Sequence, residues 1–75
     1  VLVIDDDPAV LDLMQRYLER EGYSVVTAAN PIDGLELAKQ SPDVIILDVM
    51  MPEMNGWSVL SQLKQDPQSA DIPVI

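Results

Sequence analysis

Two short apolar runs that each end in acidic residues constrain the fold of this chain more than any other feature. The first run, residues 1–4, is followed by Asp5 and Asp6, and the second, residues 44–47, is followed by Asp48. Continuous apolar runs of this length are typical of strands buried on both faces of a parallel sheet. Because ligands of open α/β sheets bind beyond the carboxyl ends of neighbouring strands, the two acidic ends are expected to share one pocket.

Carboxylates gathered in one pocket repel one another. The usual remedies are a raised pKa or a hard divalent cation, for which carboxylate oxygens are suitable ligands. We therefore expect a Mg²⁺ site in which one carboxylate remains available for chemistry. The alternative is that Asp5 and Asp6 are ordinary polar residues that end a strand.

The charge of the chain restricts its partners. Four basic residues against 13 acidic ones give a formal net charge of -9. This balance argues against direct binding to nucleic acid or to an anionic membrane, since both require a basic surface. The chain has no cysteine and no histidine, which excludes disulfides, cysteine nucleophiles and Ser-His catalysis, as well as most zinc sites.

The length of 75 residues allows one small domain. The apolar runs are too short to span a bilayer and nothing resembles a signal peptide, so a cytoplasmic location is expected. The chain begins inside an apolar run and ends at Val74 and Ile75, which resemble the opening of another strand. We therefore expect it to be part of a longer chain.

Segments typical of strands and helices alternate along the chain, which favours a right-handed βαβ architecture. The expected strands cover residues 1–4, 23–28 and 44–47, and the expected helices cover residues 8–21, 31–39 and 56–65. Asp7 and Asn30 are predicted N-caps, because each is followed by proline at the first helical position. Gly22 is expected to end the first helix in a left-handed conformation.

Apolar side chains on the helices indicate which faces pack on the sheet. The first helix carries a stripe that is predicted to face the core, made of Val10, Leu11, Met14, Tyr17 and Leu18. Trp57, near the start of the third helix, is expected to be a partly buried packing residue. No internal repeat or domain boundary is apparent.

The order of these segments, together with two acidic motifs, resembles the response-regulator receiver domain of two-component signalling. The motifs are Asp5-Asp6 after the first strand and Asp-Val-Met-Met-Pro-Glu-Met-Asn-Gly at residues 48–56 after the third. The acid pair alone is a weak signal, but its combination with the Met-Pro and Gly loop at this spacing is strong. The resemblance covers the whole chain without gaps.

This resemblance implies an α/β fold with a doubly wound parallel sheet, the flavodoxin-like receiver fold of five strands. Residues 1–75 are then expected to form an incomplete receiver domain that breaks off at the start of the fourth strand, with the distal strands and helices missing. Receiver domains also supply a Ser or Thr after the fourth strand and a Lys after the fifth. These positions do not exist in this chain, and Lys39 and Lys64 fall on helices outside the motif.

The resemblance also implies roles for individual residues. Asp48 corresponds to the aspartate that accepts a phosphoryl group from a phosphohistidine, carried by a histidine kinase or a histidine phosphotransfer protein. Asp5, Asp6 and Asp48 correspond to the residues that hold Mg²⁺, with Asp6 as a direct ligand and Asp5 acting through water. The backbone carbonyl of Met50 corresponds to a further ligand.

The chemistry of such a site is that of a reversible switch. The Asp48 carboxylate is a weak nucleophile but is ionised at neutral pH. Mg²⁺ shared by the carboxylates and a phosphoryl oxygen neutralises the charge that repels the incoming group. The acyl phosphate product is reactive enough to be hydrolysed again. Enzymatic activity is therefore expected to be at most self-phosphorylation and autodephosphorylation, rather than that of a metabolic enzyme.

Two alternatives come from other classes of protein. The first is a Mg²⁺-dependent phosphohydrolase of the haloacid-dehalogenase type, in which Asp5 is the nucleophile. Against it, Ala9 stands where that motif expects a hydroxyl or small branched residue. The second alternative is an inactive structural fragment.

Overall fold

The computed structural model describes residues 1–48 and 56–75. Within these residues a parallel sheet is formed by three strands, β1 (Leu2–Ile4), β2 (Val26–Ala28) and β3 (Ile45–Leu47). The strand order is β2-β1-β3, so β1 lies in the centre.

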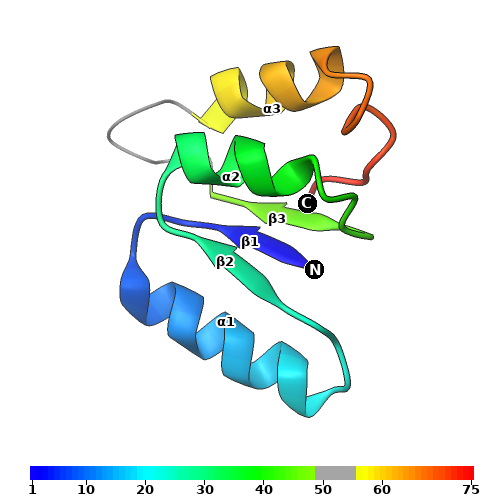
Figure 1. The fold of residues 1–75 in the computed structure, drawn as a ribbon. Coiled ribbons are helices and arrows are strands. Elements are labelled where there is room, and N and C mark those ends of the chain that lie inside the picture. Colours follow the sequence, from blue (N-terminus) through cyan, green and yellow to red (C-terminus); the bar gives the residue numbers. More distant parts are fainter. Residues whose placement is uncertain (49–55) are drawn as a thin grey trace.

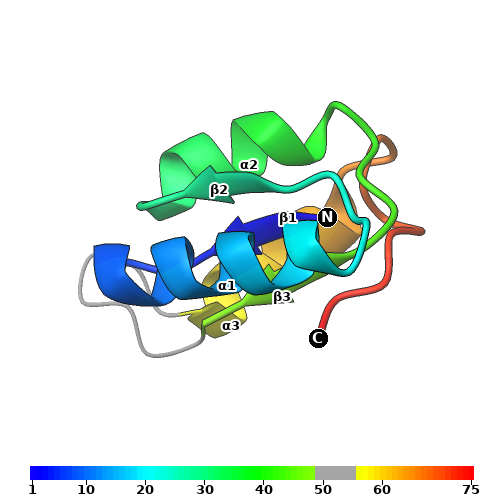
Figure 2. The ribbon, with the colours of Figure 1, turned by 90° about the horizontal axis from the view of Figure 1, so that it is seen from below.

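Helices cover both faces of this sheet. Helix α1 (Pro8–Arg20) lies on one face, and helices α2 (Pro31–Ala38) and α3 (Gly56–Gln65) lie on the other (Figure 1). Figure 2, seen from below, shows α1 in front of the strands. This arrangement confirms the predicted doubly wound α/β fold.

The central position of β1 creates a switch point in the sheet. Both neighbours pair with β1 in register, so that Ile4 lies beside Ala28 on one side and beside Leu47 on the other. The chain passes from β1 to β2 on one side and then to β3 on the opposite side. The carboxyl ends of β1 and β3 therefore flank the point where ligands bind in open α/β sheets.

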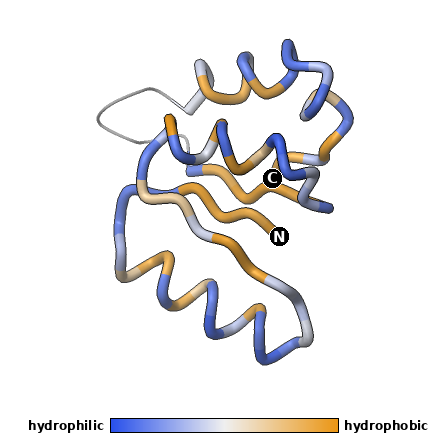
Figure 3. The backbone as a smooth tube through the Cα atoms, viewed as in Figure 1, coloured by the Kyte–Doolittle hydropathy of each residue, from blue (hydrophilic) through white to orange (hydrophobic). Residues whose placement is uncertain are grey.

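The main core lies between the sheet and helices α2 and α3. The largest side chains buried there are Leu2, Ile4, Ile45, Val59 and Leu63, each at most 1% exposed. Figure 3 shows that β1 and β3 are hydrophobic along their length, whereas the helices alternate between hydrophobic and hydrophilic segments. This pattern is expected where helices pack one side against a sheet that is covered on both faces.

The helix signals in the sequence act as predicted. The Asp7 side chain accepts a hydrogen bond from the N–H of Ala9 at 2.9 Å. The Asn30 side chain accepts one from the N–H of Asp33, also at 2.9 Å. Gly22 has a φ of +94° after the end of α1, which confirms the left-handed conformation expected there.

The predicted element bounds are correct to within one residue except at β2. This strand was expected to cover residues 23–28, but only Val26–Ala28 is strand. Val26 pairs with the start of the central strand, since its N–H donates to the carbonyl of Val1 at 2.9 Å. Tyr23 instead donates its N–H to Leu18 at the end of α1.

The predicted apolar stripe of α1 is only partly correct. Leu11 is buried, but Val10 and Tyr17 are 36% and 58% exposed. Among the described residues, α1 packs mainly on β1 and β2, and part of its stripe stays exposed. The prediction for Trp57 was wrong, since this side chain is 64% exposed. It lies about 200° around the helix from Val59, which faces the core.

The last residues of the chain extend the sheet beside β3. The N–H of Ile45 donates to the carbonyl of Pro73 at 2.9 Å, and that of Leu47 donates to Ile75 at 3.0 Å. Val74 forms a parallel bridge with Ile45. A fourth strand was expected to open here, and the pairing confirms this.

None of the helices within residues 1–48 and 56–75 has the length and hydropathy needed to cross a membrane.

A buried serine completes the end of α3. In a continuing helix the carbonyl of Leu63 would accept the N–H of residue 67, but Pro67 has no N–H to donate. The hydroxyl of Ser69, which is 2% exposed, donates to this carbonyl at 2.7 Å instead. Lys64 holds the same turn by donating to the carbonyls of Ala70 and Ile72 at 3.3 and 3.1 Å.

We predict that Ser69→Ala lowers the free energy of unfolding by about 1–3 kcal/mol, because it leaves the buried carbonyl of Leu63 without a donor. Ser61→Ala, an exposed position on the same helix, is the matched control and should change stability by less than about 0.5 kcal/mol. Urea denaturation followed by circular dichroism measures both. Equal effects of the two substitutions would contradict the assigned role of Ser69.

Candidate metal and phosphoacceptor site

Three acidic side chains meet at the carboxyl ends of β1 and β3. Asp5 and Asp6 follow β1 directly, and Asp48 follows β3. Each offers one carboxylate oxygen, and these oxygens all lie within 4.8 Å of one another. Asp5 and Asp48 are half-buried, whereas Asp6 is exposed. The structure therefore brings together all three acids that the sequence analysis placed in one pocket.

Backbone hydrogen bonds hold two of these acids at the edge of the sheet. The N–H of Asp48 donates to the carbonyl of Ile4 at 2.9 Å, and the N–H of Asp5 donates to the carbonyl of Ala28 at 3.1 Å. Both bonds continue the pairing of β1 beyond the ends of the strands. The separation of the main chain at Asp5 and at Asp48 is consequently set by the sheet itself.

The start of α1 orients Asp5. The N–H of Asp7 donates to the Oδ1 atom of Asp5 at 2.9 Å. Asp7 in turn accepts the N–H of Ala9 and acts as the N-cap of α1, as predicted. The same short turn thus begins the helix and fixes the direction of the Asp5 carboxylate.

The electrostatic environment of Asp5 disfavours its ionised form. Partial burial makes the largest contribution and raises the pKa of Asp5 above its ordinary value of 3.8. The hydrogen bond from Asp7 lowers this pKa, while the negative charges of Asp48, Asp6 and Asp7 raise it. The net effect is a raised pKa, which is the behaviour expected of carboxylates gathered without a cation.

The donor set fits a hard divalent cation. Mg²⁺ binds oxygen ligands at about 2.0–2.1 Å, so two oxygens on the same ion lie about 3–4 Å apart. Carboxylate oxygens within 4.8 Å of one another can therefore converge on one ion through small side-chain rotations. Met50, whose carbonyl was expected to be a further ligand, lies outside the described residues.

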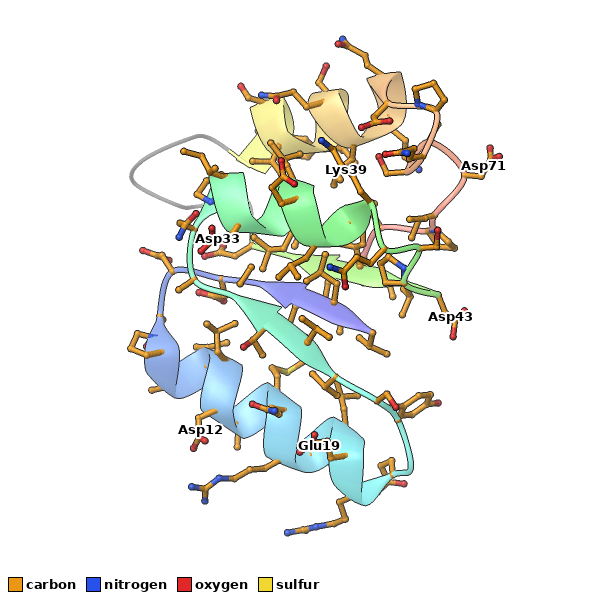
Figure 4. The ribbon with its side chains drawn as sticks, viewed as in Figure 1. Asp12, Glu19, Asp33, Lys39, Asp43 and Asp71 are labelled. Atoms are coloured by element: carbon orange, nitrogen blue, oxygen red, sulfur yellow. The ribbon has the colours of Figure 1, made fainter. Side chains whose placement is uncertain are left out.

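Several other acidic residues lie away from this site. Figure 4 shows Asp12 and Glu19 along α1, and Asp43 and Asp71 toward the opposite end of the sheet. Asp12 forms an exposed ion pair with Arg16 at 3.1 Å on the same helix. Within the described residues, the three acids at the carboxyl ends of β1 and β3 are the group close enough to hold a metal ion.

A glycine beneath the site was not predicted to contribute to it. Gly34 in α2 packs directly against the side chain of Ile4, the residue that precedes Asp5. Glycine inside a helix costs about 1 kcal/mol relative to alanine. Its presence in a short helix was the one sequence signal that could have indicated this close contact.

We predict that Asp5→Asn raises the free energy of unfolding at neutral pH in the absence of divalent cations. Because the pKa of Asp5 is raised on folding, the native state holds this proton more tightly than the unfolded state does. Ionised Asp5 therefore destabilises the fold at neutral pH. This cost disappears as the pH falls through the folded pKa and below the ordinary value of 3.8. The advantage of the Asn variant should shrink over the same range.

Urea denaturation in chelator at several pH values measures this difference. Asp43→Asn is the control, since Asp43 is exposed at the opposite end of the sheet. A variant Asp5→Asn that is less stable than the original protein at neutral pH would contradict the prediction.

Comparison with known sequences identifies relatives of this chain. The sequence model of the response regulator receiver domain matches residues 1–75. The DNA-binding dual master transcriptional regulator RpaA of Synechocystis is 47% identical over the whole chain. The chain spans about a third (32%) of the length of RpaA.

Several solved structures also resemble the chain. The N-terminal domain of a response regulator receiver protein from Methanoculleus marisnigri is 43% identical with a TM-score of 0.92, over 97% of this chain and 60% of that one. TrrA of Thermotoga maritima, solved with Mg²⁺-BeF, is 32% identical with a TM-score of 0.80, and the match covers 89% of this chain and 59% of TrrA. TrrA has also been solved in complex with the histidine kinase ThkA, with a TM-score of 0.85 and coverage of 97% and 62%.

These findings support the receiver interpretation, and they give no support to the haloacid-dehalogenase alternative. The match over every residue, the identity to RpaA and the shared fold all lead to the same group of proteins. Receiver domains of this group act in two-component signalling. The chain belongs to the response regulator receiver domain family.

Proposed function

We propose that Asp48 is the phosphoacceptor of this receiver domain, and that Asp5, Asp6, Asp48 and the backbone carbonyl of Met50 hold Mg²⁺. The observation that carries the proposal is the convergence of three carboxylates within 4.8 Å at the switch point of the sheet. The structure of TrrA with Mg²⁺-BeF supports the choice of metal. Asp6 is exposed and is the proposed direct ligand, whereas the more buried Asp5 is proposed to act through water.

The proposed reaction is transfer of a phosphoryl group from nitrogen to oxygen. An Asp48 carboxylate oxygen forms a bond to phosphorus while the bond from phosphorus to the imidazole nitrogen of a phosphohistidine breaks. The imidazole nitrogen keeps the electron pair, and Asp48 becomes an acyl phosphate. Bound Mg²⁺ supplies positive charge that offsets the charge of the phosphoryl oxygens and the carboxylates. Attack by water later releases inorganic phosphate and restores the Asp48 carboxylate.

The backbone of the site favours this chemistry. The hydrogen bond from the N–H of Asp48 to the carbonyl of Ile4 holds the main chain of the proposed nucleophile at the end of β3, so only side-chain rotation remains to be restricted when the donor binds. In the turn at Asp7, the N–H of Asp7 donates a hydrogen bond of 2.9 Å to the Asp5 carboxylate and holds its orientation. Both features position acids before the phosphodonor arrives. The proposed activity is limited to self-phosphorylation and autodephosphorylation.

The proposed partner is a histidine kinase or a histidine phosphotransfer protein, which the complex of TrrA with ThkA supports. We propose a cytoplasmic location, where such a partner would deliver its phosphoryl group. We also propose that this domain does not bind nucleic acid directly, because its net charge of -9 repels phosphate groups. Coverage of 60% of the Methanoculleus structure supports the proposal that residues 1–75 are the first part of a receiver domain.

We predict that Asp48→Asn abolishes acyl phosphate formation in the full-length protein, because the amide is not a competent nucleophile. The protein is incubated with acetyl phosphate and Mg²⁺, and the hydroxylamine-labile phosphate is measured by mass spectrometry. Asp43→Asn, on an exposed acid distant from the site, should be phosphorylated like the original protein. Loss of the phosphate in Asp5→Asn with its retention in Asp48→Asn would overturn the assignment.

We predict that Asp6→Asn weakens Mg²⁺ binding by at least about tenfold, because it removes a charged ligand from the site. Isothermal titration of the full-length protein with MgCl₂ measures the dissociation constant. Asp71→Asn removes an equal charge from an exposed position elsewhere and should leave the dissociation constant unchanged. Equal weakening by both substitutions would indicate that only net charge matters.

A further inference from the structure

Helix α2 lies unusually close to the central strand at Gly34. A Cβ atom at this position would lie 2.7, 2.9 and 3.1 Å from the Cδ1, Cγ1 and Cγ2 atoms of Ile4. The first two distances are shorter than any ordinary contact between carbon atoms. Figure 1 shows α2 on the face of the sheet opposite α1, and its packing against both β1 and β2 fixes where it rests.

The Ile4 side chain has little freedom to avoid such an atom. It is 0% exposed and belongs to the core cluster, so neighbouring side chains occupy the surrounding space. The close atoms lie on both branches of its β-carbon. Rotation about the outer bond would move Cδ1 alone, and a branched side chain is stiff at its inner bond. Relief therefore requires the backbone of α2 or of β1 to move.

The backbone of Ile4 connects the two ends that carry the acids. Its carbonyl accepts the N–H of Asp48 at 2.9 Å, and it is followed directly by Asp5. It also pairs in register with Ala28, whose carbonyl accepts the N–H of Asp5 at 3.1 Å. A displacement of Ile4 would consequently change the positions of both Asp5 and Asp48.

We infer that Gly34 is a positioning residue for the acidic site. The absence of a Cβ atom allows α2 to rest on Ile4, and this contact holds the ends of β1 and β3 at the separation that metal binding and phosphorylation require. The inference rests on the function proposed above for Asp5, Asp6 and Asp48. Gly34 itself acts through Ile4.

Gly34→Ala tests this inference in the full-length protein. We expect the dissociation constant of Mg²⁺ to rise about tenfold, as is typical when a group that supports metal ligands is changed. The rate of acyl phosphate formation from acetyl phosphate should fall as well. Amide NMR peaks of the folded form, followed during MgCl₂ titration, report the affinity of folded molecules even when part of the sample unfolds.

Gly22→Ala is the matched control for a loss of stability alone. Gly22 has a φ of +94°, so alanine is strained there, yet nothing lies within 4 Å of the added Cβ atom. This variant should be less stable but should bind Mg²⁺ with unchanged affinity. A purely structural effect would make the two glycine variants alike.

A second substitution tests the contact itself. Ile4→Val removes the Cδ1 atom, which is the atom nearest to the added Cβ at 2.7 Å. In the Gly34→Ala background it should restore part of the lost Mg²⁺ affinity, because the two γ carbons remain at 2.9 and 3.1 Å from the added Cβ. In the original background it should change the affinity little. This non-additivity would show that the two residues act through one contact.

The outcomes separate this inference from the proposed function. If the original protein neither binds Mg²⁺ nor forms an acyl phosphate, the proposed function is wrong. If the original protein does both and folded Gly34→Ala binds Mg²⁺ equally well, α2 has moved aside and the inference about Gly34 is overturned. Where too little Gly34→Ala folds in buffer, trimethylamine N-oxide favours the folded state and the same titration decides.

Discussion

The pairing of β1 with a strand on each side is the constraint on which the rest of this structure depends. The strand is three residues long, yet its main chain bonds to β2 and to β3, and its side chains Leu2 and Ile4 are almost fully buried beneath α2 and α3. The hydrogen bond from Asp48 to the carbonyl of Ile4 extends this pairing into the acidic site. The packing of the core and the geometry of the acidic site thus both depend on β1.

The site combines favourable packing with unfavourable electrostatics. Apolar burial stabilises the sheet, while the acids at its edge repel one another and raise the pKa of Asp5. Because β1 and β3 hold Asp5 and Asp48 through the backbone, the main chains that carry these two carboxylates cannot separate without breaking the sheet. Under the proposed function a cation would enter a site whose main chain is already in place, which would lower the reorganisation that binding requires.

Much of the fold could be predicted because its signals are local. The acids that end two apolar runs, the prolines that follow Asp7 and Asn30, and the glycine that ends α1 each act on residues within one helical turn. Predictions that depended on distant neighbours were less accurate. Tyr23 bonds to the end of α1 instead of joining β2, and the exposure of Trp57 and Tyr17 depends on which elements cover their helices.

The sequence by itself determined the class of fold, the bounds of most elements and the identity of the three acids that meet. These features follow from hydrophobic period, capping and turn chemistry, which act between residues close in the chain. Only the tertiary structure decided that the carboxylate oxygens lie within 4.8 Å, that Asp5 is partly buried and that Gly34 contacts Ile4. These features depend on how a helix and three strands from distant parts of the chain pack together, and a local pattern does not specify distances between them.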